Sequence, residues 1–149
     1  MFVCYGSQVK HGEETFRKVD KTYPLLCADI ANQFKIPYYS IVSSGGGDPS
    51  SMFLYMKVKG EVERDLKEKK LNYLAILKPG LIKNRPDART GEKIAQFFSF
   101  LPFPSIECVD VGRVMMMHAE EKLKDPSNEK ESLAVLENQD LLNYLKDKK

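Results

Sequence analysis

Short apolar runs alternate along the chain with longer segments in which apolar residues recur at every third or fourth position. A short run bounded by glycine, proline or serine is typical of a strand, whereas the longer spacing is typical of one helix face. The predicted strands are Met1–Tyr5, Tyr38–Ser43, Leu71–Lys78, Ile106–Val109 and Ser132–Leu136. The predicted helices are Glu13–Phe34, Met52–Glu68, Gly91–Phe100, Val111–Lys124 and Asp140–Lys146. This order predicts an α/β fold with a mainly parallel sheet flanked by helices.

The first strand and the first helix each carry a further expectation. The strand Met1–Tyr5 is continuously apolar, which suits a strand buried on both faces of a parallel sheet. Nothing precedes it in the sequence, so we expect one open edge, covered by another chain or by the rest of a larger fold. In the helix, Pro24 predicts a kink or a nearby helix start. The apolar positions of this helix predict one stripe, made by Val19, Tyr23, Leu26, Ile30 and Phe34.

Composition and charge narrow the function classes. The 149 residues are the size of one domain, and 23 basic against 21 acidic residues give a net charge of +2, which argues against nucleic acid as a partner. No apolar run approaches the roughly 20 residues of a membrane span. The three cysteines and two histidines are far apart in the sequence. We therefore expect a reducing compartment, no disulfide framework and no metal site.

The residues that suggest chemistry follow the second strand. Tyr55 and Lys59 are four positions apart on a predicted helix, which places their Cβ atoms about 5–6 Å apart on one face. An ammonium beside a phenol favours the ionised form, so the pair can serve as a general acid/base. Ser44 ends the preceding strand, where open α/β sheets bind ligands, and its hydroxyl can bond a carbonyl oxygen. By spacing alone, the pair is more often a solvated helix face.

The order of these features resembles a known family. Ile41-Val-Ser-Ser44, Tyr55-Met-Lys-Val-Lys59-Gly-Glu-Val-Glu63 and Leu77-Lys-Pro-Gly80 look like the second half of an atypical short-chain dehydrogenase/reductase. The segment Phe53-Leu-Tyr55 with Val58-Lys-Gly-Glu-Val-Glu63 is similar to the Tat-interacting oxidoreductase branch. The resemblance covers nearly the whole chain.

The resemblance implies a Rossmann-like fold that binds NAD or NADP across the carboxyl ends of its strands. It implies that Tyr55 is the catalytic acid/base, and that Lys59 assists it and holds the nicotinamide ribose. Ser44 would orient a carbonyl or alcohol substrate, with Ser43 as the other candidate. The further residues expected near the cofactor are Gly6, Pro79, Gly80 and Leu81.

One family feature has no counterpart in the sequence. The family opens with a strand, a G-x-x-G-x-x-G turn and a helix whose N-terminus binds the pyrophosphate. The glycine cluster Gly45–Gly47 lacks that spacing and follows the second strand. Against the family, Met1 aligns with the fourth strand, so we expect residues 1–149 to form the C-terminal portion of an NAD(P)-binding Rossmann-like domain. The first three strand–helix units are then missing, and cofactor binding is expected to be impaired.

Three interpretations remain open at this point. The chain is an NAD(P)-dependent oxidoreductase, or a non-catalytic regulatory or protein-binding remnant, or a shortened isoform with little function of its own. The second interpretation predicts a protein partner or self-association at the first strand. The resemblance implies a location in the cytoplasm and also in the nucleus. The substrate is left open, as is the choice between NAD and NADP.

Overall fold

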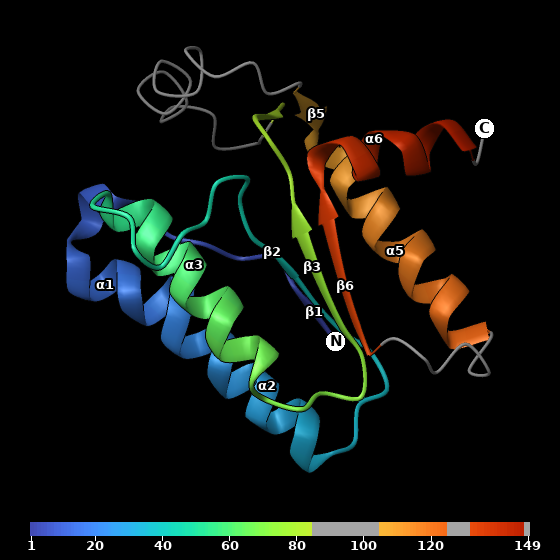
Figure 1. Cartoon of the computed structure of the whole chain (residues 1–149), viewed down its shortest axis with the longest axis horizontal. Helices are drawn as coiled ribbons and strands as arrows, with labels where there is room; N and C mark the ends of the chain where they lie inside the picture. Colours follow the sequence, from blue (N-terminus) through green and yellow to red (C-terminus); the bar gives the residue numbers. More distant parts are fainter. Residues whose placement is uncertain (85–104, 125–131, 148–149) are drawn as a thin grey trace.

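A four-stranded parallel sheet forms the centre of the structure, a computed structural model that describes residues 1–84, 105–124 and 132–147. The strands lie in the order β1-β2-β3-β6, and every neighbouring pair is parallel. Their bounds are Phe2–Val3 for β1, Tyr39–Val42 for β2, Leu74–Lys78 for β3 and Leu133–Glu137 for β6. Because all four run the same way, their carboxyl ends meet at one edge of the sheet, the upper edge in Figure 1.

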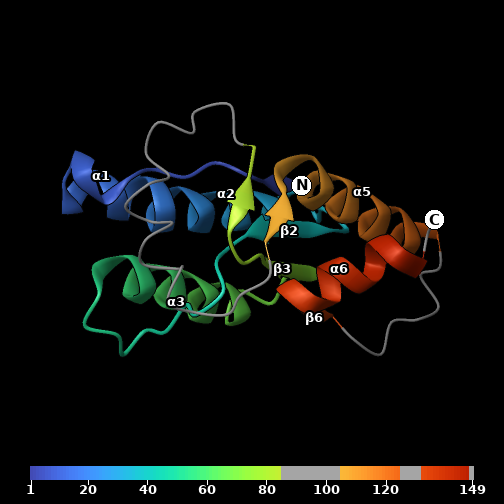
Figure 2. The ribbon, with the colours of Figure 1, turned by 90° about the horizontal axis from the view of Figure 1, so that it is seen from above.

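Helices cover both faces of this sheet (Figures 1 and 2). One face is covered by α1 (Glu13–Arg17), α2 (Tyr23–Gln33) and α3 (Leu54–Lys67). The other is covered by α5 (Cys108–Lys124) and α6 (Asn138–Asp147). The prediction of an α/β fold with a mainly parallel sheet between helices is confirmed.

The alternation of side chains along the strands explains the two layers. In β2 and β3, Ile41 and Ile76 point into the core shared with α2 and α3. Ala75 and Leu77 belong to the second core, together with Val114 of α5. Successive residues of a strand face opposite sides, so a continuous apolar run supplies both cores at once.

Three further short elements are a 3-10 turn and a pair of two-residue strands. A 3-10 turn, η1, spans Val9–His11, and the two-residue strands β4 (Ile82–Lys83) and β5 (Ile106–Glu107) pair in parallel. The sequence did not predict β4. The predicted helix Gly91–Phe100 lies outside the described residues. The described helices are not long and apolar enough to cross a bilayer.

The first strand differs from the prediction. Only Phe2 and Val3 are extended, and Val3 is 2% exposed whereas Phe2 is 49% exposed. The expectation of burial on both faces is therefore wrong. β1 lies at the end of the strand order, so its outer edge pairs with no strand among the described residues.

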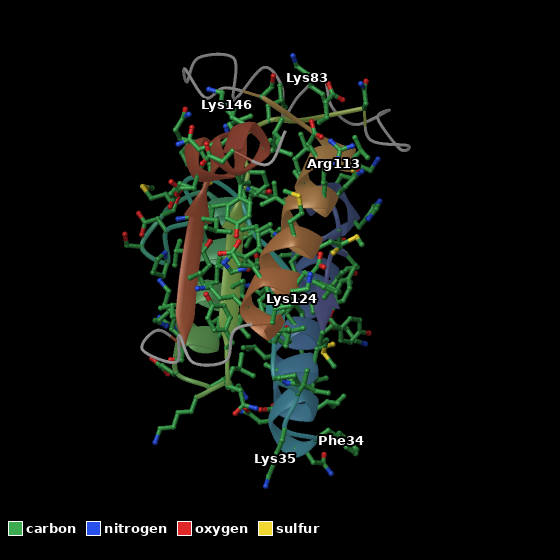
Figure 3. The ribbon with its side chains drawn as sticks, turned by 90° about the vertical axis from the view of Figure 1, so that its right-hand side faces the viewer. Phe34, Lys35, Lys83, Arg113, Lys124 and Lys146 are labelled. Carbon is green, nitrogen blue, oxygen red and sulfur yellow. The ribbon has the colours of Figure 1, made fainter. Side chains whose placement is uncertain are left out.

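The predicted apolar stripe of the first helix also lies on the wrong side. Leu26, Ile30 and Phe34 are exposed, and Figure 3 shows Phe34 at the end of α2, directed away from the ribbon. The residues that face the sheet are the small Ala28 and Ala31, both fully buried. Small side chains let the helix lie close to the strands, so they take the inner positions although larger apolar residues were available.

Pro24 shapes the start of α2 in a way that matters for the site. A proline ring cannot donate a hydrogen bond and clashes with the carbonyl of the residue four positions earlier, which here is Asp20. The helix accommodates this by a π-helical turn, η2, at Lys18–Thr22, between α1 and α2. Of the two predicted alternatives, the nearby helix start is confirmed, because α2 begins at Tyr23 with Pro24 in its first turn. The π turn that precedes it is a feature that is frequent at functional sites. Asp20 lies in its middle and is buried.

A buried histidine of α5, His118, packs near the amino ends of β2 and β3. The Nδ1 atom of His118 is 2.8 Å from the hydroxyl oxygen of Tyr38, and its ring is tilted against that of Tyr73. Burial lowers the pKa of His118, and the charge of Lys122 lowers it further against a smaller opposing effect of Glu121. His118 is therefore neutral in the folded protein under conditions in which an exposed histidine begins to protonate.

Acid is expected to destabilise the fold through His118. As the pH falls below about 6.5, the unfolded chain takes up a proton that the folded chain does not, so the free energy of unfolding decreases. The decrease is at most about 1.4 kcal/mol per pH unit for one group. Urea unfolding between about pH 7 and pH 5, above the range of carboxylates, measures it. His118→Gln should flatten this slope, whereas the exposed His11→Gln should leave it unchanged. Equal slopes in all three proteins would contradict the assignment.

Candidate functional site

The loops that follow β1, β2 and β3 come together at the carboxyl edge of the sheet. The segments after β2 and β3 are joined by backbone hydrogen bonds: Ser43 N–H donates to the carbonyl oxygen of Leu77 at 2.7 Å, and Gly45 N–H to that of Pro79 at 3.0 Å. Gly80 N–H donates to Oδ1 of Asn138, the first residue of α6, at 2.8 Å. Residues from distant parts of the chain that the sequence predicts for the site are thus held together at the carboxyl edge of the sheet.

Lys59 is the most firmly held residue of the predicted set. Its Nζ atom is 2.9 Å from Oδ1 of Asp20, and the side chains are 8% and 1% exposed. Asp20 is itself fixed, because its Oδ2 accepts a hydrogen bond of 2.7 Å from the backbone N–H of Ser7. A Cβ atom at Gly6 would lie 3.2 Å from Oδ1 of Asp20, so the chain after β1 passes close to this carboxylate. The π turn, the β1 loop and α3 therefore meet at one buried ion pair.

Tyr55 lies one helical turn before Lys59, on the same side of α3. Its ring stacks on that of Phe16, with centroids 5.8 Å apart and an interplanar angle of 29°. Tyr55 is half-buried. In the described part of the chain, Lys59 is bonded to Asp20 rather than to the phenol of Tyr55. Tyr55 and Lys59 thus lie on one face of α3, and the ammonium of Lys59 is held by Asp20.

The two candidate serines have different surroundings. The hydroxyl of Ser43 donates to Oε1 of Glu63, a buried carboxylate of α3. Among the described residues, the hydroxyl of Ser44 donates to the carbonyl oxygen of the adjacent Gly45, at 3.3 Å. Both side chains are buried, but the hydroxyl of Ser44 makes the weaker hydrogen bond and is therefore the more available to a ligand.

Besides the Lys59–Asp20 pair, a row of charged side chains begins at Glu63. Its Oε2 is 3.6 Å from Nζ of Lys78 on β3, which is 3.0 Å from Oε1 of Glu137 on β6. Burial works against the charge on Lys78, but the hydrogen bond to Glu137 and the charge of Glu63 raise the pKa of this lysine above its ordinary value. Lys78 is therefore a permanent cation beside the site at neutral pH.

Asp20 and Glu63 were not singled out as functional residues from the sequence. Glu63 follows Lys59 by four positions, the spacing that also relates Lys59 to Tyr55. That repeat places all three on one helix face and was a usable signal. Asp20 had a weaker signal, an acidic residue four positions before a proline in an apolar helix.

No ligand-binding cluster for a metal is found in the described residues, where His, Cys, Asp and Glu never gather in groups of three or more. The three cysteines are free thiols. Leu81, expected near the cofactor, accepts a backbone hydrogen bond of 3.0 Å from Ile106 at the β4–β5 pair. The sequence also predicts that the loop Lys83 to Thr90 and the segment Phe97 to Pro104 shape a substrate pocket. Residues 85–104 of these segments lie outside the described residues.

Comparison with known proteins supplies relatives. No family model matches the chain. The chain is 36% identical to the protein HTATIP2 of Rattus norvegicus over 154 aligned positions, which cover 98% of this chain and 61% of the rat protein. It is 36% identical to the mitochondrial protein fmp52 of Emericella nidulans over 83 positions, 55% of this chain and 36% of that protein. With the mitochondrial protein FMP52 of Lodderomyces elongisporus it shares 31% identity over 121 positions, 74% of this chain and 51% of that protein.

These relatives correct one expectation and support another. The predicted location in the cytoplasm and nucleus is wrong as an implication of the family, because fungal relatives are named as mitochondrial proteins. The chain spans 61% of the rat protein's length and less of the two fungal ones. The similarity to HTATIP2 over almost the whole chain supports the resemblance to the Tat-interacting oxidoreductase branch that the sequence shows.

Proposed function

We propose that this chain carries the acid/base half of an NAD(P)-dependent oxidoreductase that acts on a carbonyl or alcohol substrate. The observation that carries the proposal is the buried Lys59–Asp20 ion pair, 2.9 Å long and one helical turn from Tyr55. Removing two charges from water is costly, and the attraction within such a pair often fails to repay that cost. A buried lysine at the ligand-binding edge of an α/β sheet is therefore a candidate for function rather than for stability.

Each residue has a role in the proposed reaction. The phenol of Tyr55 donates its proton to the carbonyl oxygen of the substrate, or accepts it in the reverse direction. The ammonium of Lys59 stabilises the phenolate, and Asp20 keeps that ammonium in place. Ser44 supplies a hydroxyl that hydrogen-bonds the substrate oxygen.

The residues present fit one end of a dinucleotide cofactor. Ser7 Oγ, in the loop after β1, is buried and has no hydrogen-bond partner among the described residues, so a polar ligand group could satisfy it. Gly6 leaves the neighbouring backbone without a side chain, and Lys59 supplies a charge for the nicotinamide ribose. The remaining residues proposed for that end are Pro79, Gly80 and Leu81. When bound, NAD(P)H supplies the hydride. The phosphate end has no such counterpart, since the 149 residues contain no G-x-x-G-x-x-G.

Titration with NADPH and with NADH tests the proposal. We expect saturable but weakened binding, detectable below millimolar concentration by fluorescence or calorimetry, together with reduction of phenanthrenequinone as a general carbonyl probe. Tyr55→Phe keeps the ring that stacks on Phe16, so binding should persist while the reduction rate falls roughly 100-fold or more. The matched control is Tyr23→Phe, an exposed tyrosine on α2, which should change neither quantity.

The outcome also decides between two functions. If a folded protein, judged by circular dichroism, binds neither cofactor up to millimolar concentration, the oxidoreductase proposal fails. The second candidate is then a protein-binding or regulatory role. Two observations favour it: the outer edge of β1 is unpaired among the described residues, and Leu26, Ile30 and Phe34 expose an apolar stripe on α2.

Self-association is the simplest form of that second candidate. We expect the sedimentation coefficient to rise with protein concentration, because exposed apolar side chains and an open strand edge favour pairing of two chains. Ile30→Glu, at a position that is 46% exposed, should suppress the rise without loss of the circular-dichroism signal. A wild-type protein that stays monomeric at high concentration would count against it.

A further inference from the structure

Three side chains lie along one face of α3, at successive intervals of four residues. Tyr55, Lys59 and Glu63 each contact a different part of the molecule, namely Phe16 of α1, Asp20 of the π turn and Ser43 after β2. The first two belong to the proposed acid/base pair. Glu63 is 6% exposed. The family resemblance includes it in the matched segment but gives it no role, and the proposed reaction does not use it.

Glu63 lies against the loop that follows β2, residues 43–48, which we call the serine loop. Its Oε1 accepts the hydrogen bond from Ser43, and a Cβ atom at Gly47 would lie only 2.8 Å from that oxygen. The loop is held to α3 at a second point, where Asp48 N–H donates to the carbonyl oxygen of Met56 at 3.0 Å. Between these two attachments lies Ser44, whose carbonyl accepts a bond of 3.3 Å from Gly47 N–H. The position of Ser44 relative to α3 is therefore set by contacts on both sides of it.

The charge on Glu63 has a partner that keeps it an acceptor. Lys78 lies 3.6 Å from its Oε2, and the exposed carboxylate of Glu137 holds the other side of that lysine at 3.0 Å. A buried carboxylate without such compensation would be strongly disfavoured. With it, Glu63 can accept the Ser43 hydroxyl as a charge-assisted hydrogen bond, which is stronger than a neutral one.

We propose that Glu63 is a positioning residue that fixes the serine loop on the helix carrying Tyr55 and Lys59. This inference rests on the proposed function for its kinetic consequence. It assigns different roles to the two serines: Ser43 anchors the loop to Glu63, and Ser44 faces the substrate. The same helix face then sets the distance between the acid/base phenol and the substrate-binding hydroxyl, a distance on which the rate depends steeply.

Four variants test this assignment. Glu63→Ala removes the acceptor, Glu63→Gln keeps an oxygen acceptor but removes the charge, and Ser43→Ala removes the donor. The matched control is Glu61→Gln, on the same helix, whose carboxylate pairs with Arg17 and Lys21 away from the serine loop. Amide hydrogen exchange of residues 43–48 is measured by mass spectrometry, and reduction of phenanthrenequinone by NADPH is measured in parallel.

We expect faster exchange of residues 43–48 in Glu63→Ala and Ser43→Ala, a smaller increase in Glu63→Gln, and none in Glu61→Gln. In the kinetic arm, kcat should fall roughly ten-fold or more in Glu63→Ala, with KM within roughly two-fold of wild type, because orientation rather than binding is lost. Glu63→Gln should recover most of kcat.

Each contrary result has a distinct meaning. Unchanged exchange in the loop in both Glu63→Ala and Ser43→Ala overturns the positioning role. A higher KM with unchanged kcat in Ser43→Ala also overturns it, because Ser43 would then contact the substrate. If wild type reduces no probe, the proposed function fails, and the exchange of residues 43–48 alone decides whether Glu63 holds the loop.

Discussion

Replacing Gly60 by alanine is expected to destabilise the protein by roughly 2–3 kcal/mol, although alanine is the better helix former. Gly60 lies inside α3, where α3 crosses the serine loop. A Cβ atom there would lie 2.3 Å from the backbone nitrogen of Pro49 and 2.4 Å from the carbonyl carbon of Asp48. These are backbone atoms, so no side chain can rotate away, and the loop itself must move. The clash outweighs the gain of about 1 kcal/mol in helix propensity.

Gly112 provides a matched control for this experiment. It lies inside α5, and a Cβ atom there would meet nothing within 4 Å. Gly112→Ala should therefore stabilise the protein by about 0.5–1 kcal/mol. Urea unfolding measures both changes as opposite shifts of the transition midpoint. A Gly60→Ala protein as stable as wild type would mean that the loop is not packed against α3 as described.

The fold was predictable from the sequence because its signals are local. The apolar runs that form β2 and β3 are bounded by prolines or polar turns. Alternate side chains of these strands contribute to the two cores on either face of the sheet. The start of α3 was predicted at Met52, whereas the helix begins at Leu54. Ser51 explains the difference, since its hydroxyl accepts a bond from Phe53 N–H before the helix begins. Local polar contacts of this kind shift a boundary without changing the element.

The orientation of α2 was not predictable in the same way. Apolar residues occur on more than one side of this helix, so periodicity alone does not say which side meets the sheet. The structure selects Ala28 and Ala31 for the inner face, because helix–sheet distance favours small side chains there. The larger Leu26 and Ile30 are left outside, where the sequence offers no indication of what contacts them.

The candidate site was predictable only along one helix. The spacing of Tyr55 and Lys59 is a local property of α3. The partners of that helix, Asp20 and Ser43, come from other elements, and their contacts depend on how the sheet brings those elements together. The sequence therefore indicated the candidate pair Tyr55 and Lys59, but not the ion pair of Lys59 with Asp20 or the hydrogen bond of Ser43 to Glu63.

Replacing Asp20 by asparagine is expected to have the largest effect on stability. The amide oxygen can still accept the bond from Ser7 N–H, but the ammonium of Lys59 loses its buried counter-charge. Breaking a buried ion pair from one side costs about 3–5 kcal/mol, because the remaining charge is uncompensated. Arg113→Gln breaks an ion pair in which the arginine is 57% exposed and should cost less than about 1 kcal/mol. Equal losses in the two variants would contradict the burial of the Asp20–Lys59 pair.

The double variant Asp20→Asn/Lys59→Met separates stability from function. Methionine has a comparable length without the charge, so most of the stability lost in Asp20→Asn should return, since apolar residues often replace a buried ion pair at little cost. Under the proposed function, carbonyl reduction should not return, because the ammonium one helical turn from Tyr55 is absent. Recovery of the midpoint without activity would mean that the fold does not require this ion pair. The cost of burying it would then be explained by the chemistry at Tyr55, whereas a double variant as unstable as Asp20→Asn would assign the pair to the architecture of α3 and the π turn.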